Sequence, residues 1–327
     1  MKTRRYSLGI AVIFCLLIFI VIPVKATSTG LTDENNPQLY SHSHHQAATV
    51  GQSGDQIKAK KPKTKAKAYI VLNRKTGAIL LQKNANKQRL IASTGKLMTI
   101  YLARRKLASY PQDWKQRLSF SKSLIKMGAD PGFDGFHAKK GRKYTVKQLL
   151  ESAIIDSDDN SAIRLGQWVA GSNRKFITMM NKQAKLWQIK ARFVSASGLE
   201  NDDLARYGYY VKGGRTSGNL LSAKSLAIVA YHVAHDYPSL MKYFATGSMK
   251  VAGQWLVNEN RMLPGHKYYH KSFELDGMKT GWTPRAGYCF VGSCRKGDGL
   301  ITVVLNDENE FSDTVKLMRF AYRNVNN

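Results

Sequence analysis

The chain has 327 residues, and its apolar content of 43% is ordinary for a protein with a buried core. This length suits one large domain or two small ones, and three cysteines without zinc-binding spacing exclude a cysteine-based zinc site. The net charge of +29 predicts attraction to polyanions, which means nucleic acid, anionic lipid or acidic cell-surface polymer.

The N-terminus has the layout of an export signal. Lysine and arginine in "MKTRRYS" precede an apolar run over residues 8–22, and "VKA" ends at Ala26 with small or apolar residues at the cleavage positions. The run of 15 residues is shorter than the roughly 20 that span a bilayer, which favours a cleaved signal over residues 1–26. Extension to residue 24 keeps an uncleaved anchor as the alternative. Export excludes nucleic acid as a partner and places the protein in the medium, on the cell wall or at the outer face of the membrane.

Residues 27–67 are poor in apolar side chains and predict a disordered polar linker that ends in a lysine-rich run. Within it, "SHSHHQ" is interpreted as a polar tract and not as a metal site. Residues 1–26 carry four basic side chains, and residues 27–67 carry six basic and three acidic ones. A charge of +22 therefore remains on residues 68–327, which predicts contact with anionic cell-wall polymers or a membrane surface.

A folded domain is predicted over residues 68–327. Two β-rich runs flank Lys75-Thr76-Gly77 and predict a hairpin, in which this tripeptide is only a turn. Apolar spacing of three and four then predicts helices over residues 94–108, 145–156, 161–171 and 174–187. Strands over about 275–305, with a hairpin turn at "RKGDG", precede a closing helix over 311–325. Strands at both ends and helices between them predict an α+β domain whose sheet joins the two ends of the chain.

Two of the cysteines lie on one predicted strand. Cys289 and Cys294 are five residues apart, so their side chains point to opposite faces of the sheet. This spacing makes them poor disulfide partners, and we expect two packed thiols. Cys15 lies within the export signal.

Ser93 and Lys96 in "IASTGKLMT" form a candidate nucleophile and base. Three residues apart on a helix, they share a face. A serine hydroxyl needs a neighbour that removes its proton, and a lysine does so only if burial or another cation lowers its pKa. Alone, the pair equally describes an ordinary helix start with a solvated lysine, so the rest of the chain has to supply a second cation.

Lys279-Thr280-Gly281 supplies that cation at the start of the C-terminal strands. Lys279 and Thr280 are suited to bind a carboxylate, and Gly281 lets a substrate backbone approach closely. We expect Lys279 also to depress the pKa of Lys96. A third element, "SDDN", lies between two predicted helices, where Ser157 is placed to point into a cleft or, alternatively, to cap the next helix.

The order Ser-x-x-Lys, a Ser/Asn loop and Lys-Thr-Gly is typical of penicillin-binding proteins and class A β-lactamases. From about residue 68 onward, the chain resembles the serine D-alanyl-D-alanine carboxypeptidases (peptidase S11 family) of the penicillin-binding superfamily. The resemblance is carried by "LIASTGKLMT", "SASGLE", "LLSAKSLAIVA" and above all "LDGMKTGWTPRAGYCFVGS". It implies a β-lactamase/transpeptidase-like fold, with an antiparallel sheet made from both chain ends and a mostly helical subdomain.

The middle motif departs from the family pattern, which is Ser-x-Asn, often followed by Asp. Gapless reading places Ser157 at the serine and Asp159 at the asparagine, with Asn160 next. Either Asp159 replaces the amide beside the substrate, or the loop shifts by one residue and Asn160 takes the catalytic role.

The resemblance also implies a mechanism. Ser93 would attack the carbonyl between the two terminal D-alanines of a peptidoglycan stem peptide, Lys96 would accept its proton, and Ser157 would relay a proton to the leaving D-alanine. The backbone N–H groups of Ser93 and Trp282 would hold the oxyanion. Lys279 and Thr280 would bind the terminal carboxylate, β-lactams would act as inhibitors, and neither a metal nor an organic cofactor is implied.

Three alternatives stay open from the sequence. A β-lactamase needs a base that activates the deacylating water, and Glu200 in "GLENDD" lacks the surrounding pattern of such a base. A non-catalytic wall-binding protein on the same fold is favoured by the exchanged Asp159-Asn160 pair. A transpeptidase differs only in its acceptor, which depends on the shape of the cleft.

Overall fold

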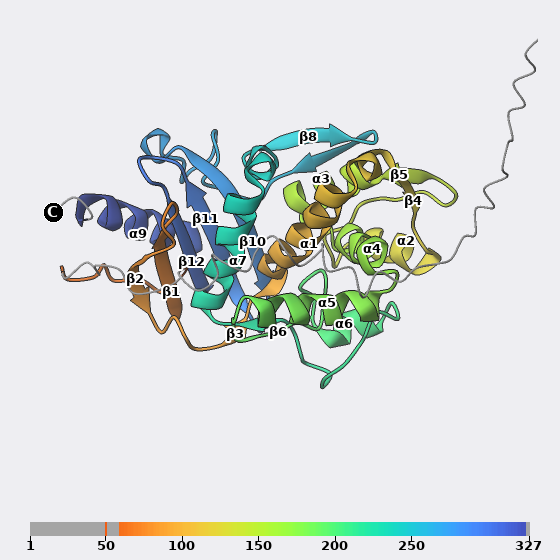
Figure 1. The fold of residues 1–327 in the computed structure, drawn as a ribbon, viewed down its shortest axis with the longest axis horizontal. Coiled ribbons are helices and arrows are strands. Elements are labelled where there is room, and N and C mark those ends of the chain that lie inside the picture. The colour runs from red at the N-terminus through yellow and green to blue at the C-terminus, as the bar shows by residue number, and fades with distance from the viewer. Residues whose placement is uncertain (1–49, 51–58, 325–327) are drawn as a thin grey trace, which may run out of the picture. The chain divides into compact units, whose positions relative to one another are not determined.

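The computed structural model of the protein describes Val50 and residues 59–324 (Figure 1). The predicted export signal, most of the predicted linker, the histidine-containing tract and Cys15 lie outside these residues. None of the helices within the described part combines the length and apolar character that a bilayer crossing requires.

The central sheet is built from the two ends of the domain, as the sequence predicts. Its strand order is β10-β11-β12-β1-β2, and the neighbours pair antiparallel. The "KTG" at residues 75–77 is the β1–β2 turn, and "RKGDG" is the turn between β11 and β12. The strands are β1 (Ala68–Asn73), β2 (Ile79–Lys83), β10 (Leu275–Thr283), β11 (Gly287–Cys294) and β12 (Leu300–Asp307). The predicted α+β class is confirmed.

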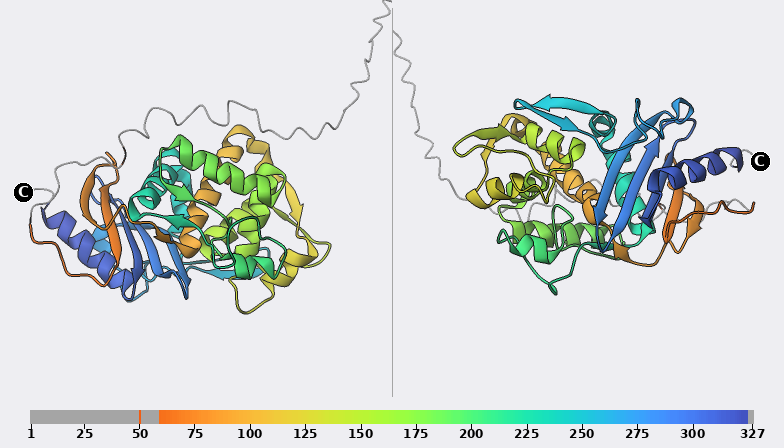
Figure 2. Two further views of the ribbon diagram at one scale, coloured as in Figure 1. Left: turned by 90° about the horizontal axis from the view of Figure 1, so that it is seen from below. Right: turned by 180° about the vertical axis from the view of Figure 1, so that it is seen from behind.

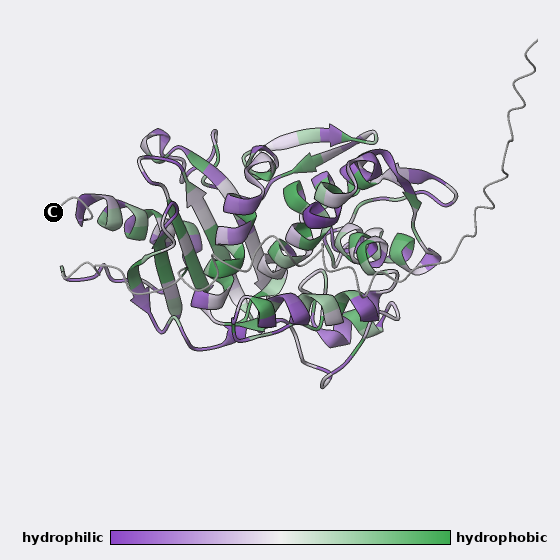
Figure 3. Ribbon diagram, in the orientation of Figure 1, coloured by the Kyte–Doolittle hydropathy of each residue, from purple (hydrophilic) through white to green (hydrophobic). Residues whose placement is uncertain are grey.

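Both faces of this sheet are covered by helices. Tyr69 and Val71 of β1 face a cluster that includes α9 (Glu310–Asn324), whereas the alternate residues Ile70 and Leu72 face the larger core that includes α7 (Ala223–Asp236). The two helices accordingly lie on opposite sides of the sheet, and the strands between them are strongly apolar (Figures 2 and 3). Alternate residues of a strand point to opposite faces, so a sheet that is covered on both faces buries consecutive residues of its strands.

The two strand cysteines follow the same alternation. Cys289 belongs to the core on the α7 side and Cys294 to the cluster on the α9 side, and both are buried free thiols. Burial raises the pKa of Cys289 to about 12 and that of Cys294 to about 11, so both remain protonated. The prediction of two packed thiols is confirmed.

The folded domain begins slightly earlier than the predicted boundary at residue 68. Ala66 is fully buried, and the Lys67 N–H donates to the Asn306 carbonyl over 3.2 Å. The Lys65 N–H donates to the carboxylate of Asp313 on α9. These backbone contacts fix the last residues of the lysine-rich run against β12 and α9. This end of the predicted disordered linker is therefore ordered in the structure.

A mostly helical subdomain carries the rest of the chain, with short strand pairs at its edges. The predicted helices correspond to α1, α3, α4 and α5. The helices other than α7 and α9 are α1 (Lys96–Ser109), α2 (Lys122–Gly128), α3 (Val146–Ile155), α4 (Asp159–Ala170), α5 (Asn173–Leu186), α6 (Asn201–Ala205) and α8 (Met241–Phe244). The short strands are β3 (Arg89–Leu90), β4 (Arg117–Ser119), β5 (Lys143–Thr145), β6 (Ala191–Arg192), β7 (Leu220–Leu221), β8 (Ser248–Val251) and β9 (Gln254–Val257).

Asn160 in the first turn of α4 ties three segments of the helical subdomain together. Its Oδ1 accepts from the Phe136 N–H at 3.0 Å, and its Nδ2 donates to the carbonyls of Phe136 at 2.8 Å and Leu124 at 3.2 Å. A Cβ on Gly128 would stand 2.2 Å from that Nδ2, so α2 approaches the amide as closely as a glycine permits. The proposal that Asn160 takes a catalytic role is therefore wrong, because its amide is fully engaged in the interior.

We expect Asn160→Ala to destabilise the fold by about 2–4 kcal/mol, because the substitution leaves buried backbone groups of Phe136 and Leu124 without partners. Thermal or urea unfolding measures this loss. Labelling by a fluorescent penicillin, counted per folded molecule, should remain. Asn86→Ala, at an exposed turn position, is the matched control. If Asn160→Ala is as stable as the wild type but is no longer labelled, Asn160 has a catalytic role and not a structural one.

Candidate active site

Ser93 and Lys96 lie where a 3-10 turn runs into a long helix. Ser93 belongs to η2 (Ala92–Gly95), and α1 begins with the lysine itself. Lys96 is fully buried, and its Nζ donates to Ser93 Oγ over 2.8 Å. The two side chains meet as their spacing predicts, and an ordinary helix start with a solvated lysine is excluded.

The backbone that presents Ser93 is held in an unusual conformation. Ala92 has a φ of 46°, a left-handed conformation that costs a non-glycine residue about 1–3 kcal/mol unless its surroundings fix it. Gly198 of "SASGLE" packs against it, and a Cβ there would stand 2.2 Å from the Ala92 carbonyl oxygen. The Ile91 N–H donates to the carbonyl of buried Asn219 over 3.2 Å. The glycine of "SASGLE" is therefore required for this segment to pack closely against the backbone that presents Ser93.

The turn between α3 and α4 brings Ser157 and Asp159 to the same lysine. Ser157 has a φ of 64°, and its Oγ lies 3.4 Å from Lys96 Nζ. Asp159 Oδ1 accepts from Lys96 Nζ at 2.7 Å, and in this ion pair the lysine is fully buried and the aspartate almost fully buried. No shift of register occurs, so Asp159 and not Asn160 occupies the third position of the middle motif.

Strand β10 places Lys-Thr-Gly opposite Ser93. Lys279 is almost fully buried, and its Nζ lies 3.4 Å from Thr280 Oγ1. A Cβ on Gly281 would stand 2.9 Å from the Ser93 backbone nitrogen, so only a glycine lets β10 approach η2 so closely. Trp282, the next residue, exposes about half of its surface at the cleft.

These segments surround a cleft of about 590 Å³, large enough for a short peptide. Of the residues predicted from sequence, Ser93, Ser157, Asp159, Gly281 and Trp282 line it directly. The rest of its wall includes carboxylates from three loops, which are Asp134, Glu200 and Glu259.

Charges of both signs compete inside the site. Burial and, after it, the charge of Lys96 lower the pKa of Lys279 to about 8. Burial raises the pKa of Asp159 to about 6, against the opposing effect of Lys96. The two buried lysines therefore repel each other, with the effect on the pKa of Lys279, and the buried acid beside them is Asp159.

Sequence reasoning missed two of the cleft carboxylates. Asp134 lies on the loop before β5, where burial raises its pKa and a hydrogen bond with Ser157 opposes that rise. Glu259 lies shortly after the end of β9, and its carboxylate accepts a hydrogen bond from Thr280 Oγ1 at 3.0 Å. The neighbouring Asn258 and Asn260 are buried and bonded to backbone groups, so they aim the glutamate outward. Neither acid belongs to a recognisable local motif.

The carboxylate of Glu200 is already engaged by its neighbours. Thr283 Oγ1 donates to it at 2.7 Å, and the Arg285 guanidinium forms an ion pair with it. A carboxylate held by two donors is a poor general base for a deacylating water. Within residues 59–324 and Val50, no group of histidine, cysteine, aspartate or glutamate side chains is arranged to hold a metal ion.

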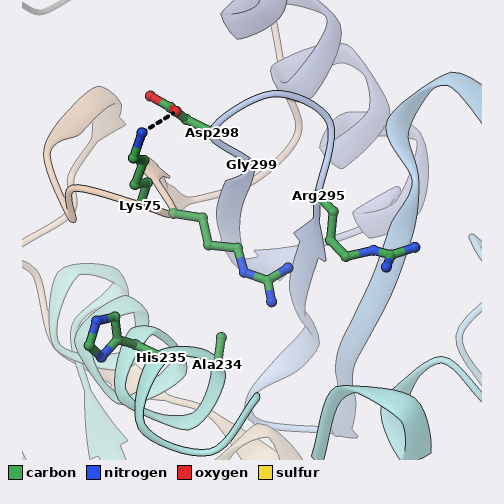
Figure 4. A pocket seen from close by; sticks show the side chains of 7 residues that line it. Lys75, Ala234, His235, Arg295, Asp298 and Gly299 are labelled. Atoms are coloured by element: carbon green, nitrogen blue, oxygen red, sulfur yellow. Dashed lines mark ion pairs between the residues drawn. The ribbon is translucent and has the colours of Figure 1, made fainter. Parts of the chain in front are cut away.

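A second cavity, of about 300 Å³, lies at the other end of β11 (Figure 4). It is bordered by Arg74, Lys75, His235, Arg295 and Asp298. Lys75 pairs with Asp298 at 3.4 Å, and Arg74 pairs with Asp276 at 2.7 Å. Because carboxylates neutralise these two cations, the cavity offers little for an anion to bind, and the chemistry concentrates in the Ser93 cleft.

Comparison with known proteins agrees with this geometry. Residues 55–309 match the model of the peptidase S11 family, described as D-alanyl-D-alanine carboxypeptidase. The D-alanyl-D-alanine carboxypeptidase DacF of Bacillus subtilis is 28% identical over 267 residues, which are 79% of this chain and 62% of that protein. This chain therefore spans under two thirds of the length of that relative.

Solved structures show the same fold. The peptidoglycan synthesis regulatory factor (PBP3) of Streptococcus pneumoniae is 32% identical, with a TM-score of 0.76 over 80% of this chain and 72% of that chain. Penicillin-binding protein D2 of Listeria monocytogenes, in its cefotaxime-bound form, is 27% identical, with a TM-score of 0.67 over 81% of this chain and all of that one. With a family match over most of its length and a Ser-Lys pair facing Lys-Thr-Gly across one cleft, the chain belongs to the S11 family of D-alanyl-D-alanine carboxypeptidases.

Proposed function

We propose that the protein is an exported serine D-alanyl-D-alanine carboxypeptidase, which removes the terminal D-alanine from peptidoglycan stem peptides through a Ser93 acyl-enzyme. The observation that carries the proposal is the 2.8 Å contact between Ser93 Oγ and the buried Lys96 Nζ, in a cleft walled by β10. Family membership supplies the substrate class.

Each step of the proposed reaction has a group within reach that supports it. Ser93 Oγ attacks the carbonyl carbon between the two D-alanines as its proton passes to Lys96. Ser157 Oγ, 3.4 Å from the same Nζ, is placed to pass a proton to the leaving amine. The backbone N–H groups of Ser93 and Trp282 form the proposed oxyanion hole, which typically contributes a few kcal/mol per donor. The close approach of Gly281 to Ser93 supports that assignment.

Recognition of the substrate's terminal carboxylate falls to Lys279 and Thr280. Their side chains lie 3.4 Å apart on the strand that faces Ser93. Glu259 complicates this role, because its carboxylate already accepts from Thr280 Oγ1 at 3.0 Å. A substrate carboxylate must therefore displace a protein carboxylate, which weakens binding of anionic C-termini relative to a cleft without Glu259.

A β-lactamase is disfavoured by the state of Glu200. That reading requires a positioned base for the deacylating water, and Glu200 is bonded to Thr283 and Arg285. The D2 protein of Listeria, whose structure holds cefotaxime, supports β-lactams as ligands of this cleft. A strained β-lactam amide that opens at Ser93 stays attached and obstructs water, whereas release of D-alanine frees space for it.

The proposed function is tested with a synthetic pentapeptide that ends in D-Ala-D-Ala. We expect mass spectrometry to show the loss of one D-alanine and a penicillin adduct that outlasts the peptide acyl-enzyme by orders of magnitude. Both should vanish in Ser93→Ala, because the nucleophile is gone, while circular dichroism stays unchanged.

Three outcomes would redirect the assignment. Rapid clearance of the adduct with catalytic release of penicilloate indicates a β-lactamase. Transfer of the acyl group to an added amine, with little hydrolysis, indicates a transpeptidase. Absence of both cleavage and labelling in a folded protein indicates a non-catalytic wall-binding role.

Glu259→Gln tests the competition for the carboxylate site. Removing the charge while keeping the size should lower KM for the free-acid pentapeptide by about fivefold, the equivalent of about 1 kcal/mol of partly screened repulsion. KM for the same peptide with a C-terminal amide should change little, because no carboxylate competes. Glu308→Gln, at an exposed carboxylate outside the cleft, is the matched control. Equal effects on both peptides would contradict the proposed competition.

We also propose that anionic wall polymers or lipid headgroups attract the basic domain. Residues 68–327 carry a charge of +22. Sedimentation with purified cell walls should weaken steeply as salt rises above about 0.1 M, where exposed charges are screened within about 10 Å. Retention that is indifferent to salt would show that binding depends on something other than charge.

A further inference from the structure

The buried ion pair between Lys96 and Asp159 stands where the family pattern has a neutral asparagine. Lys96 Nζ has three oxygen neighbours, which are Ser93 Oγ at 2.8 Å, Ser157 Oγ at 3.4 Å and Asp159 Oδ1 at 2.7 Å. An ammonium group has three protons and no lone pair, so three oxygens satisfy it completely. Such an ammonium cannot itself accept the Ser93 proton.

We propose that Asp159 is a positioning residue that makes the Lys96–Asp159 pair, and not the lysine alone, the proton acceptor for Ser93. The inference rests on the proposed function of Ser93 as the acylated nucleophile. It assigns to Asp159 a role that an asparagine at the same position could not fill, because an amide oxygen does not hold a proton near neutral pH.

The proposed step conserves protons and charge. As Ser93 Oγ bonds to the substrate carbonyl carbon, its O–H bond breaks and an N–H bond forms on Lys96. At the same time one N–H bond of Lys96 breaks, and an O–H bond forms on Asp159. Lys96 remains an ammonium, Asp159 becomes a neutral acid, and the negative charge moves to the carbonyl oxygen. When the C–N bond breaks, the proton returns through Lys96 and Ser157 to the leaving amine.

Burial favours this proton transfer, because a site with little access to solvent stabilises separated charges poorly. The side chain of Lys96 is fully buried and that of Asp159 almost fully buried, so the ion pair has little access to solvent. Ion pairs without solvent are stabilised only by close partners, so an ammonium–carboxylate pair and its neutral amine–acid form lie closer in energy than in water. Transfer of one proton over 2.7 Å is then the short path between them.

The charged groups that face the pair come from each neighbouring element. Asp134, from the loop before β5, bonds Ser157 and repels Asp159. Lys279 of β10 attracts Asp159 and repels Lys96, and Glu259 acts on Lys279 from beyond it. The pair therefore titrates as part of a small network, with apparent pKa values that belong to the group.

The sign of the pH dependence follows from these groups. The pKa of Asp159 is raised to about 6, so below that pH the pair holds both protons and no acceptor remains. The pKa of Lys279 is lowered to about 8, so above that pH the cation that binds the substrate carboxylate is lost. Acylation should therefore be fastest between about pH 6 and 8 and fall on both sides.

The experiment measures the second-order rate of Ser93 acylation by a fluorescent penicillin, and kcat/KM for D-alanine release, from pH 4.5 to 9. In the wild type, the acid limb of both profiles should lie near pH 6. In Asp159→Asn, Lys96 has to lose its own proton, so the limb should move up by at least about one pH unit, with about a tenfold lower rate at pH 6.5. An unmoved limb in this variant overturns the proposal.

Asp134→Asn is the matched control, because it converts another cleft carboxylate to an amide without touching Lys96 directly. Removing this charge relieves a repulsion that raises the pKa of Asp159, so the acid limb of this variant should stay in place or move to lower pH. A limb that rises in Asp134→Asn as it does in Asp159→Asn assigns the titration to Asp134 and overturns the proposal. If Asp159→Asn does not fold, the wild-type profile still decides, because a wild-type acid limb well above the pKa of about 6 of Asp159 overturns the proposal.

The two proposals fail in different ways. If the wild type is acylated by penicillin with a limb near pH 6 but releases no D-alanine, the carboxypeptidase assignment fails and the paired acceptor stands. If D-alanine is released and the limb is the same in wild type and Asp159→Asn, the function stands and the paired acceptor fails.

Discussion

A single buried ammonium group organises the site. Lys96 starts helix α1, and its Nζ reaches Ser93 on η2, Ser157 on the α3–α4 turn and Asp159 at the start of α4. A charge with no solvent access is tolerated only when close partners replace its hydration, and breaking such a pair typically costs about 3–5 kcal/mol. The helical subdomain therefore has to keep these segments in register, and the same constraint that stabilises the lysine positions the nucleophile.

The sheet supplies the opposite wall because it closes across the whole domain. Strand β10 is brought beside η2 only because the C-terminal strands pair with β1 from the other end of the chain. The close packing around η2 depends on two glycines: Gly281 lies against Ser93, and Gly198 lies against Ala92. A side chain at either position would push a catalytic segment outward, so the motif glycines are requirements of packing before they are requirements of chemistry.

Local sequence patterns predicted the sheet ends, the main helices and the meeting of Ser93 with Lys96, since each depends on spacing within one element. They could not decide between Asp159 and Asn160. Adjacent helix residues point about 100° apart, so the choice depends on where α4 begins, and a gapless motif alignment does not fix that residue. Glu259 and Asp134 were missed for a different reason, because each reaches the cleft from a loop whose path is set by tertiary contacts.

The cleft and the surface carry opposite electrostatic characters. The domain as a whole is strongly basic, yet the cleft places Asp134, Asp159 and Glu259 around two lysines. Long-range attraction acts through net charge and is set by the exposed lysines and arginines, whereas proton transfer acts over one or two bonds and is set by buried neighbours. The two can be tuned separately. In the proposed function, the basic exterior would attract the protein to an anionic matrix, while the carboxylates inside the cleft would act on the lysines that the proposed acylation requires.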